Sequence, residues 1–128
     1  MTTHIKTTVM LLAGLLSGCA VNPEIVATRS DKDVCQGYAA FRYVGATQNM
    51  AHLKSEILRR GLVKEEDFAV LDKGKVRIGQ STCHLYASWG KPKRENVSVS
   101  EYEKRIQHVY SSGNYVYSRN GVIRTIQQ

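Results

Sequence analysis

Four histidines and three cysteines are the side chains of this chain with the greatest capacity for chemistry. A thiol enzyme needs a base within hydrogen-bond reach of its cysteine. Cys83 and His84 are adjacent in the sequence, and adjacent residues of a helix point in different directions. A zinc site requires a spacing such as C-x-x-C or H-x-x-x-H, and the sequence contains neither. The pattern therefore predicts no catalytic residue, no metal ligand and no cofactor.

Acidic residues and glycines do not form a catalytic pattern either. The acidic run at residues 65–67 is interpreted as the charged first turn of a helix. Sugar cleavage would need two facing carboxyl groups, and the sequence nominates no such pair. Gly74, Gly79 and Gly90 are placed as turn residues rather than as a phosphate-binding loop.

The basic residues give the clearest remaining indication of function. The chain has 18 Lys and Arg against 11 Asp and Glu, a formal net charge of +7. Several of the basic residues lie in predicted loops, and eight are expected to form one basic contact face: Arg59, Arg60, Lys73, Lys75, Arg77, Lys91, Lys93 and Arg94. Such a face attracts anionic lipid headgroups, lipopolysaccharide phosphates or an acidic protein surface. A solvated surface that serves only solubility is the alternative.

The N-terminus has the pattern of an export signal. An apolar run over residues 9–16 is too short to span a bilayer and is typical of a cleaved signal peptide, here residues 1–18. The next feature, Leu16-Ser17-Gly18-Cys19, resembles the lipobox of bacterial lipoproteins, in which the cysteine thiol accepts diacylglycerol. Cys19 is therefore the expected lipidation site and mature N-terminus. An ordinary signal peptide with a chance cysteine is the alternative.

The lipobox implies a location as well as an anchor. Acyl chains would hold the protein on a membrane, and Ala20 in place of an aspartate after Cys19 implies the outer membrane, facing the periplasm, rather than the inner membrane. Residues 19–29 are expected to be the lipidated N-terminus and a tether. Loss of Lys6 with the signal leaves a net charge of +6. Nucleic acid is not an expected partner, because of this location and because the tyrosines follow strand spacing.

Two cysteines remain once Cys19 is acylated. Cys35 and Cys83 form an even pair, and in an oxidising periplasm such a pair is a disulfide candidate. A bridge between them would stabilise the fold by ~4 kcal/mol on the chain-entropy estimate. Two separate buried thiols are the alternative.

Residues 30–72 are predicted to be helical. Ser30 with Asp33 three positions later is typical of a helix start. A second helix is predicted over residues 47–60 and a shorter helical piece over residues 64–71, each from its apolar spacing and end residues.

The second half of the chain changes its period. A helix is predicted to follow Ser81 and to end before Pro92. Four short strands are then predicted at residues 97–99, 106–110, 115–117 and 122–126. Asn120-Gly121 is a strong signal for a tight hairpin turn. The expected fold class is α+β, with N-terminal helices followed by a helix and an antiparallel β-meander packed on the helices, all within one domain over residues 30–128.

The C-terminal half, about residues 76–127, carries an ordered set of short motifs: Ile78-Gly79-Gln80-Ser81, Trp89-Gly90-Lys91-Pro92, Val109-Tyr110, Tyr115-Val116-Tyr117 and Asn120-Gly121-Val122. In this order the motifs resemble the SmpA/OmlA (BamE-like) group of small outer-membrane lipoproteins. Gln80 stands where that group usually has methionine, and His108 lies near the place of its tryptophan. The resemblance implies an α+β fold, an outer-membrane location and a scaffolding role in outer-membrane protein assembly.

The expected function is therefore that of a lipid-anchored periplasmic binding or scaffold protein of the bacterial envelope. It would act through protein–protein contacts with an envelope partner rather than as an enzyme. An inhibitor or exclusion lipoprotein of the mobile-element type is the alternative. An enzyme that acts on the cell wall is a weaker one, which a pocket containing carboxylates of perturbed pKa would support.

Overall fold

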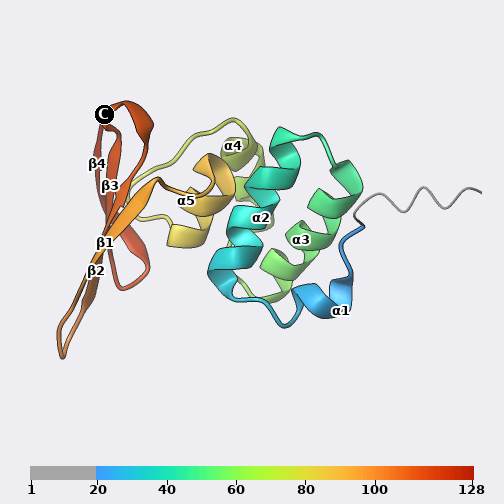
Figure 1. Ribbon diagram of the computed structural model, residues 1–128, viewed down its shortest axis with the longest axis horizontal. Coiled ribbons are helices and arrows are strands. Elements are labelled where there is room, and N and C mark those ends of the chain that lie inside the picture. Colours follow the sequence, from blue (N-terminus) through green and yellow to red (C-terminus); the bar gives the residue numbers. More distant parts are fainter. Residues whose placement is uncertain (1–19) are drawn as a thin grey trace, which may run out of the picture.

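The computed structural model describes residues 20–128 and consists of a helical layer and one sheet (Figure 1). The predicted signal peptide and Cys19 lie outside the described residues. The helices are α1 (Pro23–Val26), α2 (Asp31–Tyr43), α3 (Thr47–Arg59), α4 (Phe68–Asp72) and α5 (Thr82–Trp89), with 3₁₀ turns at Glu65–Asp67 and Ser111–Gly113. The strands are β1 (Arg94–Val99), β2 (Lys104–Val109), β3 (Tyr115–Arg119) and β4 (Val122–Gln127). This arrangement confirms the predicted α+β fold.

Serine caps begin the two helices that carry the cysteines. The Ser30 side chain accepts a hydrogen bond from the Asp33 N–H over 3.1 Å, and the Ser81 side chain accepts one from the His84 N–H over the same distance. Each cap satisfies a backbone donor that the first turn of a helix leaves unpaired. The predicted start of α2 at Ser30 is therefore confirmed.

The sheet is an antiparallel meander in the order β1-β2-β3-β4, and the helices lie on one face of it (Figure 1). Asn120 and Gly121 join β3 to β4 with φ values of 49° and 79°, as the predicted tight turn requires. β1 and β2 are longer than predicted, because they begin with polar residues at Arg94 and Lys104 that carry no alternating pattern.

α5 is the central element of the core. All six of its residues from 83 to 88 are buried. One side of α5 packs in the helical core with Ile57 and Leu71, and the other side brings Leu85 against Val116 and Ile123 of the sheet. A helix buried on all sides between two layers shows little apolar periodicity.

A disulfide joins Cys35 of α2 to Cys83 of α5, with the two Cα atoms 5.3 Å apart. This distance lies in the usual range for disulfides. The bridge confirms the predicted pairing over the alternative of two separate thiols. It fixes the N-terminal turns of the two helices against each other.

Residues 20–29 differ from the expected tether. Asn22 accepts a hydrogen bond from the Glu24 N–H and caps α1, which Pro23 begins. Val26 is 5% exposed and packs in the helical core, and the Val21 N–H donates to Asn49 Oδ1 over 3.0 Å. The segment is therefore part of the folded domain. The prediction was wrong here because a four-residue helix is too short to show a period.

Candidate functional site

The inner face of the β1–β2 hairpin changes from buried to exposed along its length. The register pairs Glu95 with His108, Val97 with Ile106 and Val99 with Lys104. Alternate residues of a strand share a face, and Glu95 contacts the helical layer, so all six side chains face the helices. His108 is fully buried, whereas Val99 is 70% exposed. We call the outer part of this hairpin, residues 97–106, the arm; it runs beyond the rest of the sheet (Figure 1).

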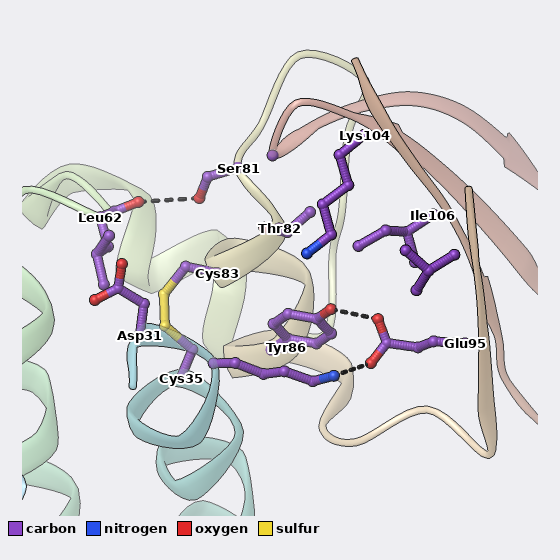
Figure 2. A pocket seen from close by; sticks show the side chains of 13 residues that line it. Asp31, Cys35, Leu62, Ser81, Thr82, Cys83, Tyr86, Glu95, Lys104 and Ile106 are labelled. Atoms are coloured by element: carbon purple, nitrogen blue, oxygen red, sulfur yellow. Dashed lines mark hydrogen bonds and ion pairs between the residues drawn. A yellow bond between two sulfur atoms is a disulfide. The ribbon is translucent and has the colours of Figure 1, made fainter. Parts of the chain in front are cut away.

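A groove of about 410 Å³ separates the arm from the helices (Figure 2). Leu62 and the Cys35–Cys83 disulfide line it on the helical side, and Val97 and Ile106 line it on the arm. The Lys104 side chain reaches from the arm toward Thr82. Lys104 Nζ forms no ion pair with any residue from 20 to 128. The groove therefore combines an apolar floor with one unpaired cation.

A polar cluster closes the groove at the base of the arm. Glu95 forms an ion pair with Lys32 of α2 and accepts a hydrogen bond from the Tyr86 hydroxyl over 2.7 Å (Figure 2). His108 Nδ1 lies 3.2 Å from Glu95 Oε2, and its Nε2 lies 2.8 Å from Ser118 Oγ. The cluster links α2 and α5 to β1, β2 and β3.

The charge states of this cluster follow from burial and from hydrogen bonding. Burial of Glu95 opposes ionisation, but hydrogen bonds from Lys32 and Tyr86 and the Lys32 charge overcome it and lower the Glu95 pKa. Burial lowers the pKa of His108, although the Glu95 charge acts in the opposite direction. Burial, and then the hydrogen bond to Glu95, raise the pKa of Tyr86. At neutral pH the cluster holds a carboxylate, a neutral imidazole and a protonated phenol.

Ser118, His108 and Glu95 follow the order of a hydroxyl–imidazole–carboxylate triad. Ser118 is only 4% exposed and His108 is fully buried, so the surrounding side chains close the hydroxyl off from a substrate. Glu95 is an ionised partner of Lys32 rather than a protonated acid. The geometry suits the attachment of the arm to the helices.

The residues of this cluster lie far apart in the sequence, which gives no sign that they meet. The sequence patterns do not single out Glu95, and they mark His108 only as one of four histidines and as the residue near the place of the SmpA/OmlA tryptophan. The pairing of Glu95 with His108 depends on the register of two strands. One signal in the sequence could have placed Glu95 on the inner face. Glu95 lies two residues before the predicted first strand and is in step with Val97 and Val99.

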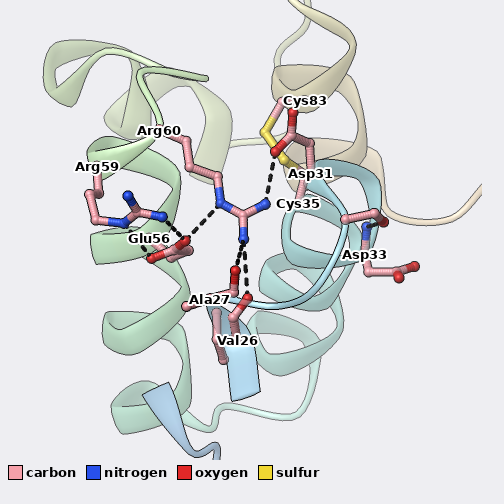
Figure 3. A network of polar contacts seen from close by, with 10 residues as sticks. Val26, Ala27, Asp31, Asp33, Cys35, Glu56, Arg59, Arg60 and Cys83 are labelled. Atoms are coloured by element: carbon pink, nitrogen blue, oxygen red, sulfur yellow. Dashed lines mark hydrogen bonds and ion pairs between the residues drawn. A yellow bond between two sulfur atoms is a disulfide. The ribbon is translucent and has the colours of Figure 1, made fainter. Parts of the chain in front are cut away.

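Arg60 belongs to a structural network and not to an open basic face (Figure 3). Its guanidinium binds Glu56 Oε1 over 2.7 Å and Asp31 Oδ1 over 2.8 Å, and it also donates to the carbonyl oxygen of Val26. Arg59 binds the same Glu56 carboxylate. Hydrogen bonds from Arg59 and Arg60 lower the Glu56 pKa to about 2. For Arg60 the predicted role in a contact face is wrong, because its side chain is needed to hold α1 and α2 to α3.

The other six predicted basic residues lie in two exposed segments that the structure brings together. Lys73, Lys75 and Arg77 belong to the α4–α5 link, and Lys91, Lys93 and Arg94 follow α5. The Trp89 indole N–H donates to the Gly74 carbonyl oxygen over 2.8 Å and joins the segments. None of the six forms an ion pair with another residue in the described part of the chain.

The outer face of the sheet carries further basic residues that were not predicted as part of the contact face. Arg105, Arg119 and Arg124 surround a shallow depression of about 350 Å³. Arg105 and Arg119 both bind Glu103. Arg124 lies at an irregularity of the β3–β4 pairing, where Tyr117 pairs with Thr125 and Ser118 with Ile123.

No group of three His, Cys, Asp or Glu side chains within residues 20–128 could hold a metal ion. In the same part of the chain, every helix is too short or too polar to cross a membrane. Compared with protein-family models, with curated proteins and with solved structures, the chain has no match. The resemblance to the SmpA/OmlA group therefore stays an expectation.

Proposed function

We propose that this chain is a lipid-anchored binding or scaffold protein of the bacterial envelope, held on the outer membrane and facing the periplasm. The motif Leu16-Ser17-Gly18-Cys19 supports the anchor. The observation that carries the binding role is the arm, where Val97, Val99 and Tyr102 are 54%, 70% and 84% exposed. Apolar side chains gathered on one projecting hairpin are typical of a contact surface.

The arrangement of the molecule supports this division of roles. The described chain begins at the end of the molecule opposite the sheet (Figure 1). A lipid on Cys19 would keep the helical end near the membrane and present the arm to the periplasm. The six exposed basic residues lie in the segments on either side of α5, which run toward the sheet (Figure 1), and Arg94 is the first residue of β1. This placement favours an acidic protein surface as their partner over lipid headgroups or lipopolysaccharide of the anchoring membrane.

Photo-crosslinking in intact cells tests the proposal. A benzophenone amino acid at Val99 or Tyr102 is expected to capture a defined envelope protein. The same probe at the exposed Glu66, outside the groove and the arm, is the matched control and is expected to capture none. The absence of any arm-specific adduct would refute a binding role for the arm. An adduct with a phage- or plasmid-targeted enzyme or receptor, rather than an assembly component, would favour the inhibitor alternative.

A further inference from the structure

The two edge strands of the sheet, β4 and β1, differ in whether another segment of the described chain pairs with them. The link before α5 pairs with the start of β4: the Gly79 N–H donates to Ile123 O, and the Ile123 N–H donates to Gln80 O, each over 2.8 Å. The Thr82 N–H donates to Gly121 O over 2.9 Å. β1 forms the other edge, and no second strand of the described chain pairs with it on that side.

The hydrogen-bond pattern shows which backbone groups of β1 lie at the free edge. The Ser100 N–H donates to Glu103 O over 2.8 Å, so Ser100 belongs to a hydrogen-bonded pair of the β1–β2 ladder. Such pairs alternate along antiparallel strands. Glu95, Val97 and Val99 therefore point their N–H and C=O groups away from β2. No residue from 20 to 128 supplies a backbone partner for them.

The same three residues point their side chains into the groove side of the hairpin. A strand added beside β1 would place every second side chain on this face. These side chains would enter the groove between the arm and the helices, where Leu62, Val97 and Ile106 provide an apolar lining. The unpaired Lys104 ammonium group would meet an acidic side chain there (Figure 2).

We propose that the free edge of β1 takes up an extended segment of a partner protein as a fifth strand. The segment has apolar residues at alternate positions and at least one acidic residue. Backbone pairing supplies affinity and the groove supplies selectivity, as in other cases of strand addition. The net charge of +6 expected after loss of the signal disfavours a second copy of this chain as the occupant and favours an acidic partner. This inference rests on the proposed binding function and names its partner chemistry.

Selection from a library of random twelve-residue peptides displayed on phage tests the inference, with the full chain purified from membranes in mild detergent. Enriched peptides are expected to alternate apolar residues and to contain Asp or Glu. A synthetic peptide of the enriched sequence should bind Val97→Pro about tenfold more weakly than the wild type, because proline removes an edge N–H without removing one from the β1–β2 ladder. Val97→Thr, which keeps that N–H, is the matched control and should stay within about threefold.

Lysine variants and hydrogen exchange complete the test. Lys104→Gln should weaken binding of the same peptide severalfold, whereas Lys64→Gln, on an exposed turn away from the groove, should not. If Val97→Pro does not fold, exchange protection of the Val97 and Val99 amides on peptide binding replaces it. Equal binding to Val97→Pro and Val97→Thr, unprotected edge amides, or self-association through β1 would each overturn strand addition. Arm-specific photo-adducts in those cases would leave the proposed binding function standing.

Discussion

The Tyr86 hydroxyl donates a 2.7 Å hydrogen bond to Glu95 Oε2 and thereby joins the central helix α5 to the edge strand β1. Tyr86 also packs edge-on against the His108 ring, with centroids 5.5 Å apart. The base of the arm is consequently fixed to the body of the protein, while Val97 and Val99 farther along stay exposed. A rigid base beneath an uncovered edge suits a surface that must be presented to a partner.

Removal of this hydroxyl should destabilise the protein. In Tyr86→Phe the partly buried Glu95 carboxylate loses a hydrogen bond, so the free energy of unfolding should fall by about 1–3 kcal/mol. Tyr102→Phe is the matched control and should leave stability unchanged, because Tyr102 is 84% exposed on the arm. Denaturation in urea measures both variants, and equal stability of the two would contradict the role given to Tyr86.

The Cys35–Cys83 bridge should contribute strongly to stability. It joins residues 48 positions apart, and for a loop of this length chain entropy predicts a loss of ~4 kcal/mol on reduction. Urea denaturation with and without reductant measures the loss. Mass analysis of the chain isolated without reductant should show it lighter by two hydrogen atoms than the reduced form. Two free thiols in that sample would rule the bridge out.

Stability should fall as the pH drops below the ordinary pKa of histidine. Burial lowers the pKa of His108, so the unfolded chain binds a proton in a range where the folded chain does not. The contribution of neutral His108 to the free energy of unfolding is fully present above about pH 6.5. It is lost as the pH falls toward the lowered pKa of His108 in the folded chain. The charged and hydrogen-bonding groups around the His108 imidazole are those of Glu95, Lys32, Tyr86 and Ser118.

Denaturation at several pH values between about 7 and 5 measures this effect. His108→Asn should show a flatter pH dependence than the wild type, because the residue that takes up the proton on unfolding is absent. His52→Asn, which removes a histidine outside the cluster, should keep the wild-type slope. Identical slopes for all three proteins would show that His108 does not couple folding to pH.

Arg60 should hold the N-terminal segment in place. Its guanidinium donates to the carbonyl oxygens of Val26 and Ala27 and also binds Asp31 and Glu56. In Arg60→Gln the amides of residues 21–29 should exchange with solvent faster. Arg59→Gln should leave them protected, because Arg59 binds only Glu56 among the described residues. Equal amide exchange rates for residues 21–29 in the two variants would contradict the structural role of Arg60.

The proposed lipid anchor is tested by metabolic labelling with radioactive palmitate. The wild-type chain should carry the label, and Cys19→Ala should lose it and move from the membrane fraction to the soluble fraction, since the acyl chains supply membrane affinity. Cys35→Ala, which removes a different cysteine, should keep the label. Unchanged labelling of Cys19→Ala would refute the lipobox.

Local signals in the sequence predicted the elements that local chemistry determines. The caps at Ser30 and Ser81 and the Asn120-Gly121 turn each depend on a few adjacent residues, and each was placed correctly. The start of β1 was missed, because Arg94 is exposed and Glu95 has a partner that only strand register supplies.

The candidate site depends on relationships between distant segments. The groove arises where Leu62 and the disulfide meet the arm, and no single stretch of sequence contains this contact. The basic residues were visible as a group, but composition could not distinguish Arg60, which is held by acidic partners, from the exposed Lys91. Only the positions of Asp31 and Glu56 in the folded chain distinguish Arg60 from Lys91.

The proposed contact surface of this anchored envelope protein is the arm. The most direct measurement is the yield of photo-adduct from position 99 relative to that from position 66 in intact cells. We expect one dominant adduct from position 99, little from position 66, and a reduced yield when Cys19→Ala removes the anchor. Equal yields from the two positions would contradict the claim.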